Sequence, residues 1–245
     1  MNTTLTTFFD RIYIINLIER KDRRAEITRQ FRQIGITDFG DKVRVFPAIR
    51  PASAAPFPSV GARGCFMSHL AILREASSDM ATRILVCEDD LNFVKDFNER
   101  IGKVLNDLNQ YAWSFFYGAY YISNSPPAID GKAISILPPS EGVRTTHFIA
   151  FQGSCIAALP GYLSSMLMRE PGDPDGGPMH VDGAYSWYRK DHPDELTAIA
   201  AHKLGYQRSS KSDIFPPSWY DGTPIVSRFV ALIRAVRARA IAYFR

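Results

Sequence analysis

Three consecutive acidic residues, Glu88, Asp89 and Asp90, follow the apolar run at 84–87, which predicts a short buried strand. Side chains alternate along an extended chain, so we expect Glu88 and Asp90 on one side and Asp89 on the other. Paired carboxylate oxygens suit Mg²⁺ or Mn²⁺ bound to a diphosphate. The alternative is a solvated turn that ends the strand and caps a helix starting at Asn92.

The elements around the triplet indicate an α/β fold. Residues 12–15 predict a first strand, Asp22 can cap a helix that ends at Gly35, and residues 43–46 predict a second strand. This order is the opening of a βαβ unit. Acids at the carboxyl end of a strand in such a sheet face the region where its ligands bind.

Further elements are predicted along the rest of the chain. The prolines in 47–60 predict a loop, and residues 113–159 are strand-like. Helical patterns cover four segments: Cys65 to about Ala76, Asn92 to Leu108, Asp182 to Lys190, and Pro193 to Leu204. Gly205 is expected to end the last of these helices. No linker is evident. We therefore expect one domain over residues 1–221 and an appended C-terminal helix over 222–245.

Composition narrows the class of protein. The 245 residues carry 29 basic and 25 acidic side chains, a formal net charge of +4. The three cysteines show no CxxC spacing, so we expect small buried side chains in a reducing compartment rather than a disulfide framework or zinc knuckle. No apolar run reaches the ~18 residues of a membrane span, and the start lacks a signal-peptide pattern.

Several motifs in order carry a family resemblance. The segments GARGCFMSHL at 61–70 and ILVCEDD at 84–90 resemble the signature of glycosyltransferase family 25, the bacterial lipooligosaccharide sugar transferases. The segment INLIERKDRR at 15–24 is similar to that family's first strand and loop, and PMHVDGAYSW at 178–187 to a later motif. GYQRSSKSDI at 205–214 is a looser match, and GSCIA at 153–157 departs from the family pattern.

The resemblance implies a GT-A type, Rossmann-like fold that binds a nucleotide sugar, with Mn²⁺ or Mg²⁺ as cofactor. It implies that Asp90 and Glu88 bind the metal ion and that Asp182 is the catalytic base. The implied donor-binding residues are Asn16, Arg20, Arg23, Ser68, His69, Glu88 and Asp89.

Each of these roles has a structural alternative. Arg23 can belong to a solvated helix face, Ser68 can cap a helix whose next residue is a core histidine, and Asp182 can be an ordinary helix cap. His180 is a weaker alternative base or metal ligand, and His202 a further ligand candidate.

The function implied is transfer of a hexose, most often galactose, from a UDP-sugar to a lipooligosaccharide or other surface glycan, with inversion. The alternatives are a degenerate family member that binds sugar or assists assembly, and a metal-dependent nucleotidyl or phosphoryl transferase. The chain has no GxxxxGK[ST] or GxGxxG run, which disfavours P-loop and dinucleotide chemistry.

The positive charge gathers at the C-terminal end of the chain. Residues 222–245 hold five arginines and no acid, which is more than the whole net charge of +4. The apolar and basic spacing over 224–245 predicts an amphipathic helix suited to an anionic membrane; its alternative is a terminal helix packed on the domain. We therefore expect a cytoplasmic protein, peripheral on the inner face of the membrane, with a lipid-linked glycan acceptor and no nucleic-acid partner.

Overall fold

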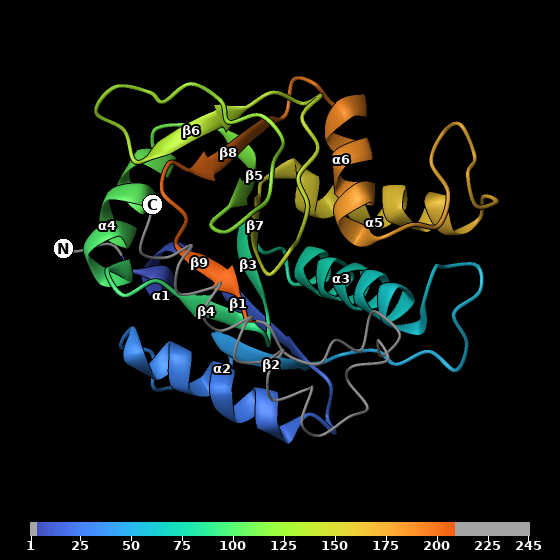
Figure 1. Ribbon diagram of the computed structural model, residues 1–245, viewed down its shortest axis with the longest axis horizontal. Coiled ribbons are helices and arrows are strands. Elements are labelled where there is room, and N and C mark those ends of the chain that lie inside the picture. Colours follow the sequence, from blue (N-terminus) through green and yellow to red (C-terminus); the bar gives the residue numbers. More distant parts are fainter. Residues whose placement is uncertain (1–3, 209–245) are drawn as a thin grey trace, which may run out of the picture.

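The computed structural model describes residues 4–208, which form a mixed α/β domain built on a seven-stranded sheet (Figure 1). The helices are α1 (Leu5–Phe8), α2 (Lys21–Gln33), α3 (Val60–Ser78), α4 (Phe97–Leu108), α5 (Ser154–Leu167) and α6 (Val181–Asp191). The strands are β1 (Arg11–Asn16), β2 (Val43–Pro47), β3 (Arg83–Glu88), β4 (Leu91–Phe93), β5 (Trp113–Tyr117), β6 (Ile134–Leu137), β7 (Phe148–Gln152), β8 (Leu196–Ala200) and β9 (Gly205–Gln207).

The large sheet has the strand order β2-β1-β3-β7-β5-β8-β6. β1 pairs in parallel with both β2 and β3, whereas β7 is antiparallel to its neighbours β3 and β5. The carboxyl ends of β1 and β3 and the amino end of β7 therefore meet at one edge. The chain order reverses between β1 and β3, and such a switch point is where open α/β sheets bind ligands.

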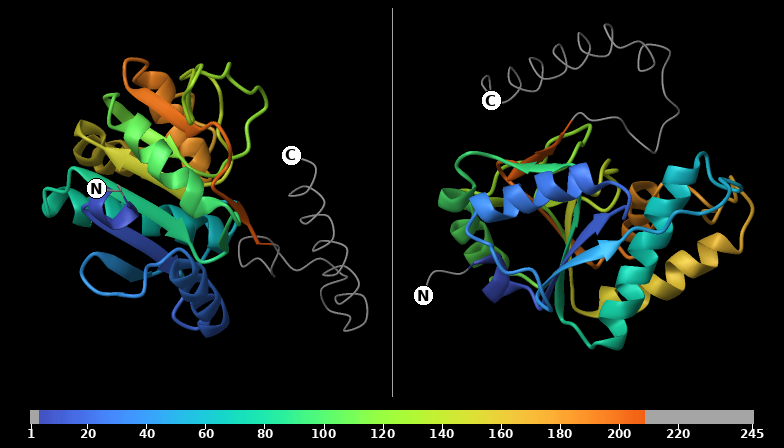
Figure 2. Two further views of the ribbon diagram at one scale, coloured as in Figure 1. Left: turned by 90° about the vertical axis from the view of Figure 1, so that its left-hand side faces the viewer. Right: turned by 90° about the horizontal axis from the view of Figure 1, so that it is seen from below.

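Helices cover both faces of the sheet, which gives the domain three layers (Figures 1 and 2). One core lies beneath α3, α5 and α6, and the other beneath α1, α2 and α4. The central strands are buried on both faces, as β3 shows with four consecutive fully buried residues from Ile84 to Cys87. Such strands appear in the sequence as continuous apolar runs.

The structure confirms the mixed α/β class and the βαβ opening. The strands predicted at 12–15, 43–46 and 84–87 are β1, β2 and β3, and the helix predicted at 182–190 is α6. Gly35 follows α2 with φ of +90°, the left-handed conformation that glycine adopts at the end of a helix.

Three helix starts were predicted at the wrong residue. α2 begins at Lys21 after Arg20, and Asp22 lies in its first turn instead of capping it. α3 begins at Val60, where the Ser59 side chain accepts a hydrogen bond from the Ala62 amide, so Ser68 lies deep inside the helix. Asn92 belongs to β4 and pairs with β9, so α4 starts only at Phe97.

Two longer segments have the opposite secondary structure to the prediction. Residues 154–159, expected to be strand-like, open α5 after Gly153, whose φ is +74°. Residues 196–200, expected to be helical, form β8 between β5 and β6, where both neighbours supply hydrogen bonds. Short apolar runs do not distinguish a buried strand from a buried helix by spacing alone.

The predicted helix over 222–245 and the motif at 209–214 lie outside the described residues. Within residues 4–208, none of the helices has the length and apolar character needed to cross a bilayer.

Candidate functional site

The acidic triplet occupies the turn between β3 and β4, at the sheet edge described above. Glu88 is the last residue of β3, and Asp89 and Asp90 form the turn. Asp89 contacts residues of β1 and α2, while Glu88 faces His69 of α3 and Asp90 contacts Gln207 of β9. The triplet therefore divides in the way that strand alternation predicts.

Asp89 is held by two partners that were predicted to bind the donor. The Asn16 side-chain amide donates to its Oδ2 over 2.8 Å, and Arg23 Nη1 donates to its Oδ1 over 3.0 Å. Burial raises the pKa of Asp89, and the charge of Arg23 and the hydrogen bond from Asn16 counter that rise. The structure thus joins Asn16, Arg23 and Asp89 in one buried cluster that fixes the triplet to β1 and α2.

Asp90 is equally buried but less well satisfied. Its Oδ2 accepts a hydrogen bond of 3.0 Å from Gln207, whereas its buried Oδ1 has no hydrogen-bond partner among residues 4–208. Burial and the neighbouring Glu88 charge together raise the pKa of Asp90 to about 7. A second carboxylate beside a buried first one disfavours ionisation unless a cation joins them.

Glu88 faces α3 and the start of β7. Thr146 Oγ1 donates to Glu88 Oε1 over 2.6 Å, and His69 Nε2 lies 3.9 Å from the same oxygen. Burial acts to raise the pKa of Glu88, but its interactions with His69 and Thr146 outweigh that effect and bring the pKa below its usual value. Glu88 therefore loses its proton more readily than Asp90 does.

His147 joins the site because β7 runs antiparallel to β3. Its carbonyl accepts the Glu88 amide hydrogen bond of 3.2 Å, and its ring is buried with neither nitrogen partnered among the described residues. Burial lowers the pKa of His147 to about 4, although Glu88 opposes that shift. The ring is accordingly neutral at pH 7.

Asp182 lies in the first turn of α6, where a carboxylate complements the helix dipole. Its Oδ2 accepts from the Thr145 amide over 3.0 Å, and its Oδ1 from the Gly183 amide over 2.8 Å. Thr145 has a φ of +76°, an uncommon conformation for a residue with a side chain. Asp182 thus ties α6 to the segment that carries Thr146.

The remaining predicted residues hold the surroundings of the site. Ser68 is fully buried; its hydroxyl donates to the Gly64 carbonyl over 2.7 Å and accepts from the Ile49 amide over 2.8 Å. Gly64 permits this approach because a Cβ there would lie 2.5 Å from the Ile49 carbonyl oxygen. Arg20 forms a two-pronged contact of 2.9–3.0 Å with Asp22, and His202 is exposed.

Sequence reasoning missed several residues of the site. Cys65, expected to be a buried apolar side chain, is only partly buried and faces the acids, so that burial and the charges of Glu88, Asp182 and Asp90 raise the pKa of its thiol. Arg208 closes the turn from the far end of the chain, donating its amide to the Asp90 carbonyl over 2.6 Å and a guanidinium nitrogen to the Asp89 carbonyl over 2.9 Å. For Cys65, the sequence signal that could have revealed its place in the site was its spacing of four residues from His69 on one helix.

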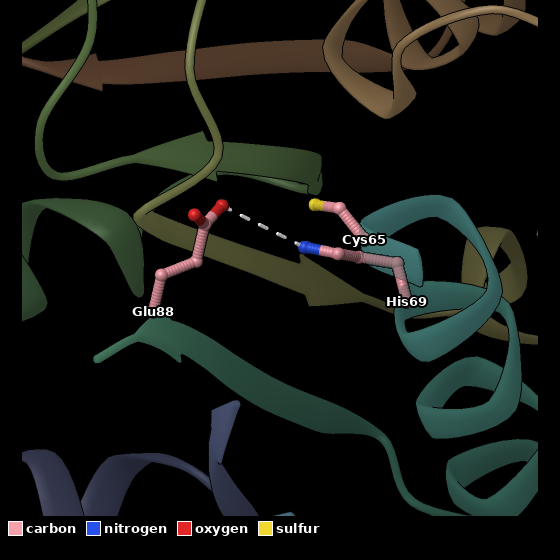
Figure 3. Close-up of side chains that lie close together, drawn as sticks. All are labelled: Cys65, His69 and Glu88. Carbon is pink, nitrogen blue, oxygen red and sulfur yellow. Dashed lines mark ion pairs between the residues drawn. The ribbon is translucent and has the colours of Figure 1, made fainter. Parts of the chain in front are cut away.

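Two sets of side chains could hold a metal ion. The oxygens of Glu88 and Asp90 are hard ligands suited to Mg²⁺ or Mn²⁺, and Asp90 Oδ1, which has no partner within residues 4–208, fits such an ion. Cys65, His69 and Glu88 bring a sulfur, a nitrogen and an oxygen within 4.8 Å of one another (Figure 3).

The fold and the site define an α/β protein with a buried acidic cluster at the switch point of its sheet. Residues 44–125 match the model of glycosyltransferase family 25 (LPS biosynthesis protein). The matched span contains the acidic triplet, Cys65 and His69, while Asn16 and Asp182 lie outside it.

Several known proteins are similar to part of this chain. The chain is 30% identical over 128 residues to procollagen galactosyltransferase 2 of Mus musculus, covering 44% of this chain and 20% of that protein. It is 26% identical over 127 residues to inactive glycosyltransferase 25 family member 3 of Homo sapiens, covering 44% and 21%. The chain thus spans about a fifth of the length of each of these two relatives.

A solved structure also aligns with the fold. It is a glycosyltransferase involved in glycosylation of the major capsid of PBCV-1, with 11% identity and a TM-score of 0.45 over 77% of this chain and 81% of that one.

Proposed function

We propose that this protein transfers a hexose from a UDP-sugar to a surface glycan, with inversion at the sugar carbon. The supporting observation is that the charges of Glu88, Asp90 and Asp182 all act on the Cys65 thiol near the switch point of the sheet, in a chain whose residues 44–125 match the family 25 model. Galactose is the proposed sugar because relatives are named galactosyltransferases.

The donor end of the site is proposed to lie at Glu88 and Asp90. These side chains would hold Mn²⁺ or Mg²⁺, which when bound neutralises charge on the departing nucleoside diphosphate. The buried, unpartnered Asp90 Oδ1 and the mutual repulsion of the two acids fit this role. Asn16 and Arg23 contribute by holding Asp89, which keeps the turn in place.

Asp182 is the proposed base that removes the proton from the acceptor hydroxyl. Each of its oxygens accepts one backbone hydrogen bond, which fixes the carboxylate and leaves a lone pair on each oxygen. Substitution Asp182→Asn should lower turnover more than it weakens donor binding. Loss of folding stability with unchanged turnover per folded molecule would instead assign it to capping α6.

The proposed acceptor is a lipooligosaccharide or another lipid-linked glycan, in keeping with the LPS biosynthesis description of the family. The basic segment 224–245 is proposed to hold the protein on the inner face of an anionic membrane. Binding of the full chain and of residues 1–221 to anionic vesicles tests this, and equal binding would contradict it.

A second candidate is a family member that binds sugar without transferring it. The similarity to a human protein described as inactive supports this alternative. It predicts binding of a nucleotide sugar or glycan with no release of nucleotide.

The deciding experiment is a screen of UDP-, GDP- and CMP-sugars for nucleotide release by the full chain with Mn²⁺ and a lipid-linked glycan. We expect release from a UDP-hexose, and a loss of about 100-fold or more in Asp90→Ala, since a bound cation contributes several kcal/mol to such a step. Asp41→Ala, which changes an exposed acid, is the matched control. Release from no donor, with binding retained, would favour the second candidate.

A further inference from the structure

Cys65, His69 and Glu88 form a cluster that the proposed transfer reaction does not require as a unit. Cys65 and His69 are four residues apart on α3, so they lie on the same face of that helix, and Glu88 ends the adjacent strand β3. Figure 3 shows the Cys65 sulfur and the His69 ring directed toward the Glu88 carboxylate. One ligand atom from each residue lies within 4.8 Å of the other two.

The two nitrogens of the His69 ring differ in their hydrogen bonding. Nδ1 lies 3.0 Å from the Tyr185 hydroxyl oxygen, which fixes the plane of the ring. Nε2 is fully buried, points into the cluster and has no hydrogen-bond partner among residues 4–208. Its distance of 3.9 Å from Glu88 Oε1 is too long for a hydrogen bond.

This pattern is that of a histidine prepared for a metal ion. Ligating histidines commonly have their second ring nitrogen bonded to another group, which selects the tautomer and orients the ring. Tyr185 supplies that contact, and Nδ1 would then carry the proton and donate it to the tyrosine oxygen. An unpaired buried nitrogen is otherwise costly to folding.

We propose that Cys65, His69 and Glu88 form a Zn²⁺ site. A thiolate, an imidazole and a carboxylate match the borderline-soft character of Zn²⁺, whereas Mg²⁺ and Ca²⁺ prefer oxygen ligands throughout. Three protein ligands leave the fourth tetrahedral position to water or to an oxygen of a bound molecule. Zn²⁺ binding releases the thiol proton of Cys65 to solvent.

The side chains must draw together to reach the ion, since their ligand atoms lie up to 4.8 Å apart. Zinc bonds of about 2.0–2.3 Å place neighbouring tetrahedral ligand atoms about 3.3–3.6 Å apart. His69 Nε2 and Glu88 Oε1, at 3.9 Å, must therefore approach by about half an ångström. Glu88 would have to lengthen its contact with Thr146 or use its second oxygen.

The test measures Zn²⁺ binding by the metal-free full chain in competition with a chromophoric chelator, and records the spectrum of the Co²⁺-loaded protein. We expect one Zn²⁺ per chain and a thiolate-to-cobalt charge-transfer band. Cys65→Ala should lose the band and weaken Zn²⁺ binding by more than about 100-fold, beyond what loss of an outer contact causes. Cys155→Ala, which removes a free thiol that lies outside the cluster, should retain both.

Glu88→Gln gives a second variant, expected to weaken Zn²⁺ binding while keeping the cobalt–thiolate band. Absence of Zn²⁺ binding at micromolar concentration, or equal binding by Cys65→Ala, would overturn the inference. No donor sugar is needed, so the result is separate from the proposed function. A chain that turns over with Mn²⁺ but binds no Zn²⁺ refutes only this site.

Discussion

Asp89 and Asp90 are consecutive, nearly equally buried and differently supported. Their exposed fractions are 7% and 8%. Asp89 has Asn16 on one oxygen and Arg23 on the other, whereas Asp90 has Gln207 on one oxygen and no partner among the described residues on the other.

The difference shows that burial alone does not define a functional carboxylate. Asp89 has a positive partner, so its charge is already balanced inside the fold. Within residues 4–208, Asp90 has no ion-pair partner, and its pKa rises to about 7. A buried acid without a counter-charge is a position for an incoming cation or proton, while a paired acid is a fixed part of the scaffold.

The largest effect should come from breaking the pair on Asp89. Both side chains are close to 10% exposed, so Arg23→Met leaves a buried carboxylate without its counter-charge. We expect a loss of about 3–5 kcal/mol in the free energy of unfolding, measured in urea. Arg24→Met, at the neighbouring exposed position, is the control. Equal losses in the two variants would show that the Arg23–Asp89 pair does not stabilise the fold more than an exposed arginine does.

Asp90→Asn should instead increase the free energy of unfolding at alkaline pH. The native Asp90 keeps its proton up to pH about 7, whereas its ordinary pKa is 3.8. Between these values the folded chain binds more protons than the unfolded chain, so this group lowers stability as pH rises. At pH 8 and without added metal, Asp90→Asn should gain about 2–4 kcal/mol over the wild type.

The control is the pH dependence of the stability difference between Asp90→Asn and the wild type. The difference between variant and wild type should be small at pH 4 and grow toward pH 7. His147 acts in the reverse direction, because its lowered pKa costs stability as pH falls from 6.5 toward 4. It is present in both proteins and cancels in the difference, so a pH-independent difference would contradict the proton on Asp90.

The smallest effect should come from Gln207→Leu, which removes the hydrogen bond to Asp90 Oδ2. That bond favours the charged carboxylate, so its loss should raise the pKa of Asp90 further. We expect about 1 kcal/mol lower stability at pH 8 and a smaller loss at pH 5. A larger loss at pH 5 would mean that Gln207 supports β9 rather than the carboxylate.

The sequence predicted the parts of the fold and site whose signals are local. β1 and β3 contain continuous apolar runs, β2 has the strand-favouring sequence Val-Arg-Val-Phe, and the acids that follow β3 are contiguous. β8 was missed because its strand character comes from the neighbours β5 and β6, which lie far away in the chain. Thr146, Gln207 and Arg208 were missed for the same reason, since antiparallel β7 and the β4–β9 pair bring them to the triplet.

Alternation along the strand predicted the division of the triplet into two sides, but not which acid would have a counter-charge. Arg23 was expected to contact phosphate, and its contact with Asp89 depends on the packing of α2 beside β1. Cys65 was interpreted from its apolar neighbours in sequence. The faces of a helix are set by residues three and four apart, and His69 was the informative neighbour.

The position of β8 also sets an order of events during synthesis. β6, at Ile134–Leu137, pairs within the large sheet only with β8, at Leu196–Ala200. A ribosome releases residues 134–137 some sixty residues before their partner strand, so β6 waits with its backbone groups unpaired. The β2-β1-β3 half can form first, and the other edge is completed only when the last part of the described chain emerges.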